Sequence, residues 1–396
     1  MNLLPYIGLQ RSRMGNGVTV LTLISFSRRR RLNSGVLMLL LRKPLLSVVC
    51  VLALSVGACQ ALVASAVEPP HTKLEMFDTM TSEEGGPVGA DSASERPPGV
   101  GMMVFVQQAT WARDLQETVA SGATWIRMDI PIGVYGSVSN GVFTPNQAKV
   151  DFYRSAAQQA DAAGLKIVLV MAAAYNSDSW SEAQFRDYNG QYWKAVSENI
   201  GQYVDLWQIF NEHDGRDYRN HAPISLTAAY LTRFRDTLAS ARTAVRTYSS
   251  APLTTTPYGY PVDEARYTRW QTFFDGIGPS LDVIGVHAYP EKSAEVIGRV
   301  PTYIKRLKAR YDKPVAVLEF GLPSVAGYGT SAEVGKAIAD EINAIMGAAP
   351  MTATLYQLRD RGTDTNNGEM VFGILRDDFS KKDYYDTVVA EMKRWR

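Results

Sequence analysis

The stretch VDLWQIFNEHD, from Val204 to Asp214, joins an apolar segment to a polar cluster. Its first half is a short run of bulky apolar side chains, which predicts a buried strand. The run stops at Asn211 and Glu212, so an amide and a carboxylate stand side by side where the strand ends. Two residues are a short motif, equally compatible with a loop or a helix cap. A second apolar run, VAVLEFG, ends in the same way at Glu319.

Strand-like and helix-like segments alternate from Gly99 to the C-terminus. Eight such units in roughly 300 residues match the size of one barrel of eight parallel strands. A doubly wound sheet rarely needs eight regular units, and no glycine-rich phosphate-binding fingerprint follows the first strand. We therefore predict an α/β fold, a single-domain (β/α)8 TIM barrel over residues 99–396. Its strands are expected at residues 100–107, 125–130, 166–174, 204–210, 252–257, 281–287, 314–319 and 352–358.

The first 66 residues have the composition of an export signal. A basic pair, Arg42-Lys43, precedes an apolar run, and residues 64–66 (ASA) fit a small-residue cleavage site. A competing interpretation is a lipoprotein processing site at VGAC, with Cys59 as the lipid anchor, and an uncleaved membrane anchor is a third. We expect a secreted or cell-envelope protein that meets a membrane only through this segment.

The remaining composition excludes several function classes. Residues 1–66 hold eight basic residues and no acid, which leaves 33 basic against 40 acidic residues, a balance that argues against nucleic acid as the partner. Both cysteines lie in the leader, and there is no clustered set of histidines, so neither a disulfide nor a metal site is expected. Residues 67–98 are rich in Pro, Glu, Ser, Thr and Gly and predict a flexible linker. We expect a monomer without a cofactor.

Polar side chains occupy the predicted ends of the strands, where a parallel barrel carries its chemistry. From the second strand to the eighth they are Arg127, Asp129, Tyr175, Asn176, Asn211, Glu212, Tyr258, His287, Tyr289, Glu319, Tyr356 and Arg359.

Two glutamates on opposite sides of a barrel mouth suit glycoside hydrolysis. A retaining mechanism needs two carboxyl groups about 5–5.5 Å apart, one to attack the anomeric carbon and one to protonate the leaving oxygen. If Arg127 points at Glu319, it would keep that carboxylate ionised for attack. Glu212 would then act as the acid, and Asn211 could bind a sugar hydroxyl beside the reacting carbon.

These motifs resemble those of glycoside hydrolase clan A. FNE at residues 210–212, HAY at 287–289 and LEFG at 318–321, with the early Arg127, are most similar to the cellulase-like family 5 and to family 39. The closing segment FGILRDDFSKKDYYDTV is similar to the end of such enzymes. The resemblance implies that Glu212 is the acid/base, Glu319 the nucleophile and Asn211 a sugar contact. Supporting roles would fall to Arg127, His287 and Tyr289.

One position departs from the clan pattern. Clan members usually place a tryptophan at the end of the eighth strand as a platform for the sugar, and this chain has Tyr356 there. The shape of the sugar site and the identity of the sugar therefore stay open. Other aromatic residues are candidates for stacking or for ordinary packing, namely Tyr175, Trp180, Tyr258, Tyr260 and Tyr328.

Structural roles compete with the supporting functional ones. Arg127 could pair with Asp129, and His287 could be a half-buried histidine satisfied by its neighbours. Asp129 and Asp214 are expected to be structural, and Ser324 has no recognisable base near it, which argues against a serine hydrolase.

The leading hypothesis is an exported retaining β-glycosidase that acts on a poly- or oligosaccharide. The alternatives are a catalytically silent carbohydrate-binding barrel and a metal-dependent hydrolase, which four scattered histidines support poorly.

Overall fold

The computed structural model describes residues 6–14, 18–26, 98–172, 180–214, 217, 224–259, 263–290, 293–325, 328–364 and 367–396. The chain divides into two compact units, Met1–Val88 and Gly89–Arg396. In the first unit, β1 (Tyr6–Met14) pairs antiparallel with β2 (Val18–Phe26), a hairpin that the sequence interpretation of this region as a leader did not include. In the described residues, no helix combines the length and apolar character needed to cross a membrane.

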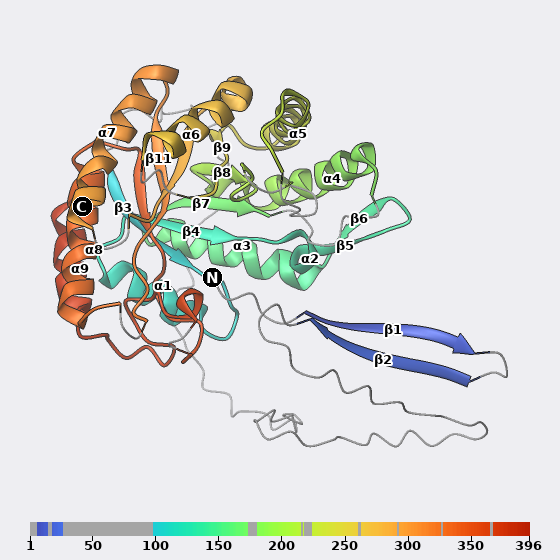
Figure 1. Ribbon diagram of the computed structural model, residues 1–396, viewed down its shortest axis with the longest axis horizontal. Helices are drawn as coiled ribbons and strands as arrows, with labels where there is room; N and C mark the ends of the chain where they lie inside the picture. Colours follow the sequence, from blue (N-terminus) through green and yellow to red (C-terminus); the bar gives the residue numbers. More distant parts are fainter. Residues whose placement is uncertain are drawn as a thin grey trace, which may run out of the picture. The chain divides into compact units, whose positions relative to one another are not determined.

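The second unit is a barrel of eight parallel strands surrounded by helices (Figure 1), which confirms the predicted fold. Its strands are β3 (Gly99–Val104), β4 (Trp125–Asp129), β7 (Lys166–Met171), β8 (Leu206–Ile209), β9 (Leu253–Thr254), β10 (Ile284–Ala288), β11 (Val315–Phe320) and β12 (Thr352–Leu355). Neighbouring strands pair in parallel in the order β10-β11-β12-β3-β4-β7-β8-β9.

The two ends of this sheet meet at β9 and the start of β10. The carbonyl of Leu253 accepts hydrogen bonds from the amides of Asp282 (2.9 Å) and Val283 (3.3 Å). Gly285 allows the close approach, because a Cβ there would lie 2.5 Å from Oγ1 of Thr254. These contacts nearly close the barrel and bring the C-terminal ends of all eight strands to one mouth.

The outer helices are α1 (Trp111–Ala120), α3 (Gln147–Ala162), α4 (Glu182–Ile200), α5 (Ala228–Arg246), α6 (Glu264–Ile277), α7 (Ala294–Tyr311), α8 (Ser331–Met346) and α9 (Tyr385–Arg394). Short polar side chains cap the N-termini of most of these helices. Ser181 and Thr330 form capping boxes with the third residues of α4 and α8, and Asn146 caps α3. Short 3-10 turns η1 (Gly201–Tyr203), η2 (Gly278–Ser280) and η3 (Gly368–Met370) complete the unit.

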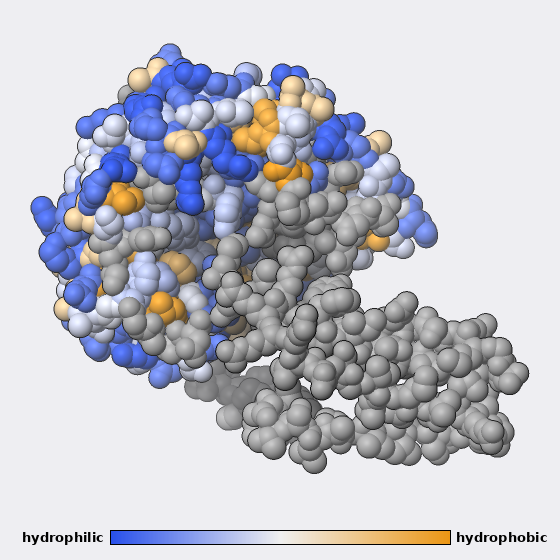
Figure 2. All heavy atoms as spheres, viewed as in Figure 1, coloured by the Kyte–Doolittle hydropathy of each residue, from blue (hydrophilic) through white to orange (hydrophobic). Residues whose placement is uncertain are grey.

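Side chains pack in two layers. Those on the outer face of the strands join the helices in one large core. A smaller cluster is made by residues from alternating positions of the strands, as expected inside a barrel: Trp125, Val168, Leu206, Val283, Ala316 and Leu318. The outer surface visible in Figure 2 is mostly hydrophilic, with hydrophobic residues in small groups.

An insertion between β4 and α3 departs from the predicted alternation. The chain forms the short helix α2 (Ile132–Tyr135) and a hairpin of β5 (Gly136–Ser139) and β6 (Val142–Pro145). Asn140 and Gly141 both adopt positive φ at its turn, 51° and 80°. The Asn-Gly pair is a strong hairpin signal that the sequence interpretation passed over.

Several predicted strands were too long. The first, third and eighth end at Val104, Met171 and Leu355, several residues before their predicted ends. Beyond the first and eighth of these strands Val106, Tyr356 and Leu358 are partly or fully buried, which explains why the apolar pattern continues past their ends.

Candidate active site

Six of the predicted site residues converge at the mouth of the barrel. They come from the ends of four strands: Arg127 in β4, Asn211 and Glu212 after β8, His287 in β10, Tyr289 after it, and Glu319 in β11. Parallel strands deliver their C-terminal residues to one edge, so positions far apart in sequence become neighbours.

Arg127 holds Glu319 through a buried ion pair. Its Nη1 atom lies 2.8 Å from Oε1 of Glu319, and the two side chains are only 2% and 10% exposed. The other donors of the guanidinium are also used, since Nε donates to Gln208 (2.9 Å) and Nη2 to Asn211 (3.0 Å). Among the described residues Arg127 makes no direct ion pair with Asp129; burial raises the pKa of that carboxyl, and the charge of Arg127 opposes the rise.

The environment of Glu319 favours its ionised form. Burial by itself would raise the pKa of this carboxyl, and the charges of His287 and Arg127 oppose that effect. Hydrogen bonds from Tyr289 (hydroxyl to Oε2, 2.7 Å) and from Arg127 act in the same direction, and the pKa is lowered from its ordinary value. The pKa of the Tyr289 hydroxyl is raised by burial and by Glu319, so it remains a donor. Glu319 is therefore an anion at neutral pH.

Glu212 enters the mouth from a tight turn after β8. Phe210 and Glu212 both adopt left-handed φ, 62° and 63°, a conformation that side chains other than glycine rarely adopt. Packing holds the strained turn, because the ring of Phe210 is fully buried among Phe185, Trp193, His213 and Phe234. Strain of this kind is typical of functional sites, where the surroundings fix one geometry.

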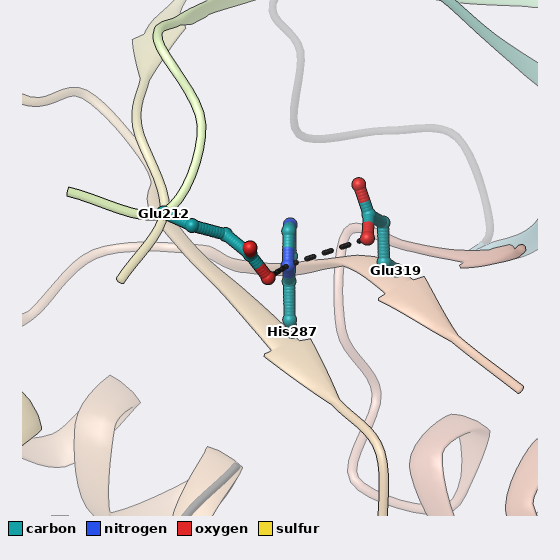
Figure 3. Close-up of side chains that lie close together, drawn as sticks. All are labelled: Glu212, His287 and Glu319. Carbon is teal, nitrogen blue, oxygen red and sulfur yellow. Dashed lines mark hydrogen bonds and ion pairs between the residues drawn. The ribbon is translucent and has the colours of Figure 1, made fainter. Parts of the chain in front are cut away.

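His287 lies between the two glutamates (Figure 3). Its Nδ1 atom is 2.9 Å from Oε1 of Glu212 and 3.4 Å from Oε2 of Glu319. The imidazole is fully buried, and its Nε2 atom has no hydrogen-bond partner in the described part of the chain. The position links the two carboxylates electrostatically, so the histidine is not merely a satisfied core residue.

A second group of contacts fixes Asn211. Its Oδ1 atom accepts from Arg127, from Nε2 of Gln208 (2.7 Å) and from the hydroxyl of Thr256 (3.3 Å). The acceptor is therefore saturated by protein, and the amide NH2 of Asn211 is the group left to meet a substrate. Gln208 and Thr256 are buried, and no pattern in the sequence marked them.

A cavity of about 870 Å³ opens above these groups. Asn211, Glu212, Tyr289 and Glu319 line it, together with the predicted aromatics Tyr258, Tyr328 and Tyr356. Trp180 instead packs against Phe185 and Tyr188 of α4, so its predicted stacking role has no support here. Tyr175, Asn176 and Tyr260 lie outside the described residues.

Tyr356 takes the place at the end of β12 where the sequence resemblance led us to expect a tryptophan. The residue is 9% exposed, and its ring meets Phe105, Tyr289 and Phe372 edge to face at centroid distances of 6.0, 6.4 and 5.4 Å. Gly321 makes room for this segment, because a Cβ at its φ of 144° would lie 2.6 Å from the carbonyl oxygen of Tyr356. The tyrosine thus sits in an aromatic wall of the cavity.

Sequence reasoning missed several other residues of the cavity wall, among them the four residues Arg266, Arg269, Phe372 and Glu369. Two come from α6 and two from the segment between β12 and α9. Phe372 lay within the closing segment compared with the clan, but loop residues have no period that would place them in the mouth.

Glu212, His287 and Glu319 also meet a geometric criterion for a metal site, since one ligand atom of each lies within 4.8 Å of the others. Glu319 is already neutralised by Arg127 and receives a hydrogen bond from Tyr289. A metal ion at this position would share the Glu319 carboxylate with the guanidinium of Arg127, and the two positive charges would repel each other. The residues therefore fit an acid and a nucleophile better than a metal.

An eight-stranded barrel whose mouth holds paired glutamates beside a large cavity has the architecture of a glycosidase. A family model described as the glycosyl hydrolase catalytic core matches residues 151–367, and the chain belongs to this family. The protein is therefore a glycosidase, and its substrate is a carbohydrate. No curated protein matches its sequence.

Solved structures of glycosidases share the fold. A family 39 glycoside hydrolase from Bacteroides cellulosilyticus aligns with a TM-score of 0.58 and 18% identity, over 76% of this chain and 64% of that one. A GH5_18 protein of Bifidobacterium longum, in complex with Manb1-4GlcNAc, gives 0.59 and 12%, covering 75% and 78%. A hyperthermophilic beta-glucosidase from Pyrococcus furiosus gives 0.55 and 13%, covering 72% and 84%. At these identities the likeness shows the fold alone.

Proposed function

We propose that this chain is an exported retaining β-glycosidase that uses Glu319 as nucleophile and Glu212 as acid/base. One observation carries the proposal: a carboxylate oxygen of Glu212 and a carboxylate oxygen of Glu319 lie within 4.8 Å of each other. Retaining enzymes hold the two groups about 5–5.5 Å apart, whereas inverting enzymes need about 6.5–9.5 Å to admit a water. A separation of this order supports the retaining class over the inverting one.

In the first step a carboxylate oxygen of Glu319 attacks the anomeric carbon, and the glycosidic C–O bond breaks. Glu212 gives its proton to the leaving oxygen, so the leaving group departs as an alcohol. In the second step water attacks the same carbon and gives its proton to Glu212, and the bond to Glu319 breaks. Both carboxyl groups then regain their starting states.

The surrounding residues support these two roles. Arg127 and Tyr289 keep Glu319 ionised and orient its oxygens. Arg127 and Gln208 donate to Oδ1 of Asn211, so its NH2 group can donate to a sugar hydroxyl beside the reacting carbon. His287 lies between the two carboxyl groups and contacts both. It can therefore stabilise the charge on Glu319 before the attack and the charge on Glu212 after it has given up its proton.

The test is an assay of the full chain on aryl β-glycosides and polysaccharides, beside Glu212→Gln and Glu319→Gln variants. We expect Glu319→Gln to be inactive on every substrate. Glu212→Gln should retain activity on dinitrophenyl glycosides, which need little acid assistance, and lose about 10²–10⁴-fold on poor leaving groups. NMR of the first product should show retention of anomeric configuration.

Three outcomes would contradict the proposal. An inverted product would assign water rather than Glu319 as the nucleophile. Loss of activity with a chelator would favour a metal at Glu212, His287 and Glu319. Binding of a polysaccharide without turnover, equal in all three proteins, would favour a carbohydrate-binding barrel.

Export is the second part of the proposal. Its support is the basic and apolar composition of residues 1–66. Fractionation of cells that produce the full chain should place the protein in the envelope or the medium, and Cys59→Ser should release it from the envelope if a lipid anchors it. Recovery of the intact chain in the cytoplasm would contradict export.

A further inference from the structure

The cavity wall beside Glu212 carries two arginines on one helix. Arg266 and Arg269 are one turn apart on α6 and line the cavity together with Tyr258 and Trp270. Among the large hydrophobic residues that are exposed in the described part of the chain, Tyr258 (43% exposed) is the one that lines this cavity. An aromatic face next to two guanidinium groups is suited to a sugar ring with a negative charge.

This wall is attached to the turn of Glu212. The Glu212 amide donates to the carbonyl of Thr256 (3.1 Å), and the amide of Tyr258 donates to the side chain of Asp214. Arg269 contacts the same Asp214 with Nε at 2.8 Å from Oδ2. Glu319 has a separate set of partners, Arg127 among them. Because the acid protonates the leaving oxygen, a wall that adjoins Glu212 faces the leaving group.

The two arginines differ in how much of the guanidinium group is available to bind a ligand. Arg269 uses Nε and Nη2 on Asp214, so part of its guanidinium is occupied in holding the fold. The guanidinium of Arg266 makes no hydrogen bond or ion pair with any residue that the structure describes, and its side chain is exposed. An arginine fork that has no protein partner in a substrate cavity favours a carboxylate or sulfate ligand.

The wall formed by the segment between β12 and α9 has the opposite character. Glu369 lines the same cavity and lies 3.6 Å from Arg361, which stacks on the ring of Phe105 at 4.6 Å. A carboxylate there disfavours an anionic sugar and favours hydroxyl groups. The charge of this wall therefore differs from that of the wall that carries Arg266 and Arg269.

We propose that the leaving-group side of this cavity binds an anionic sugar unit, with Arg266 and Arg269 holding its carboxylate or sulfate and Tyr258 stacking on its ring. The inference rests on the proposed function, since it takes Glu212 as the acid. Arg266 is then a specificity-determining residue, and the natural substrate is an acidic polysaccharide or oligosaccharide.

The experiment uses aryl β-glycosides that differ only in the leaving group. 3-Carboxy-4-nitrophenyl glycosides are compared with their methyl esters and with the 3-sulfo analogues, in gluco, galacto, manno and xylo configurations. The proteins are the full-length wild type, Arg266→Gln and the control Arg235→Gln, which removes the same charge from an exposed position on α5 away from the cavity. The ratio of kcat/KM for acid and ester, compared between proteins, cancels intrinsic reactivity.

We expect the acid-to-ester ratio to fall about tenfold in Arg266→Gln, as for loss of one charge-assisted hydrogen bond. It should stay unchanged in Arg235→Gln, and in wild type it should fall as salt is raised from about 0.05 to 0.5 M. The sulfo analogue tells whether the site prefers carboxylate or sulfate. Equal ratios in all three proteins would overturn the inference.

Failure of the proposed function has a different signature. If no protein hydrolyses any glycoside, the catalytic roles are wrong, and binding of the intact acid and ester is then measured by calorimetry. If wild type and Arg235→Gln bind the acid more tightly than the ester and only Arg266→Gln does not, the anion site is supported even though the catalytic roles are wrong. The same affinity for acid and ester would reject it.

Discussion

Two buried ion pairs in the barrel unit look alike and differ in their surroundings. Arg127 and Glu319 are 2.8 Å apart at the mouth, and Lys382 and Asp360 are 2.8 Å apart in the segment between β12 and α9. All four side chains are at most 10% exposed. Burial and pairing alone therefore cannot tell a carboxylate that faces the cavity from one that only joins segments of the fold.

The second pair is satisfied by its own chain. Besides Asp360, the Lys382 ammonium donates to Ser324 (2.7 Å) and to the carbonyl of Val371 (3.0 Å), which uses its three protons. The carboxylate of Asp360 also accepts from the amide of Gly373 at 2.8 Å. These contacts fasten the loop that carries part of the cavity wall.

The pKa directions separate the two pairs. Burial raises the pKa of Asp360 and lowers that of Lys382, so both partners are pushed towards neutrality despite their contacts. For Glu319 the charges and hydrogen bonds outweigh burial, and the pKa is lowered. The pair at the mouth is built to keep an anion facing a cavity, and the other pair is built to hold two segments together.

The same cluster corrects one sequence expectation. Ser324 was expected to have no base nearby, and the structure places the amine of Lys382 2.7 Å from its hydroxyl. Lys382 is ion-paired with Asp360, and the hydroxyl of Ser324 donates to the carbonyl of Val371. The amine thus donates to the hydroxyl of Ser324, and the proton of that hydroxyl is directed at the carbonyl of Val371 instead of at the amine, so the argument against a serine hydrolase stands.

The largest effect is expected from Arg127→Met, which breaks the pair at the mouth. Loss of the guanidinium removes a positive charge from beside Glu319 and one hydrogen-bond donor each from Gln208 and Asn211. We expect kcat/KM to fall about 10²–10³-fold at neutral pH and its acid limb to move to higher pH. Arg127→Lys should restore part of the acid limb but not the rate, because an ammonium keeps the charge without the fork. An unchanged pH profile in Arg127→Met would contradict the role of this pair.

A smaller effect, confined to stability, is expected from Asp360→Asn. The change leaves a buried ammonium without its anion, which costs about 3 kcal/mol in the free energy of unfolding. Urea unfolding measures the loss, and kcat/KM on an aryl glycoside should stay within about threefold of wild type. Replacing both partners, in Asp360→Leu with Lys382→Met, should recover most of the stability. A large loss of kcat/KM in the folded Asp360→Asn protein would show that this pair also supports activity, which would contradict the distinction between the two pairs.

The two regions also show what sequence could and could not predict. Asn211, Glu212 and Glu319 end apolar runs, and that pattern, together with the alternation of eight strand–helix units, predicted their place at a barrel mouth. Lys382 and Asp360 lie in an irregular segment without a period, so nothing in the sequence indicated their contact. Arg266 and Arg269 follow the helical period of α6, but which face lines the cavity depends on the packing of the whole barrel.

Tyr289→Phe is expected to have the smallest effect, and it tests the pKa argument most directly. The hydroxyl hydrogen bond to Glu319 helps to lower the pKa of that carboxyl below its ordinary value of 4.5, so its removal should raise it. A lowered pKa contributes stability that is present above the unfolded value and is lost as pH falls through the folded value. The variant should therefore lose that stability at a higher pH than wild type. The acid limb of kcat/KM should move up by about one pH unit or less, since one hydrogen bond contributes about 1 kcal/mol.

A pH–rate profile from about pH 3 to 8 measures this shift, since the range spans the ordinary pKa of a glutamate. Tyr385→Phe, an aromatic change in α9 outside the cavity, serves as the control and should leave the acid limb in place. A limb that moves to lower pH in Tyr289→Phe would mean that the hydroxyl stabilises the protonated acid, and Glu319 would then be the proton donor instead of the nucleophile.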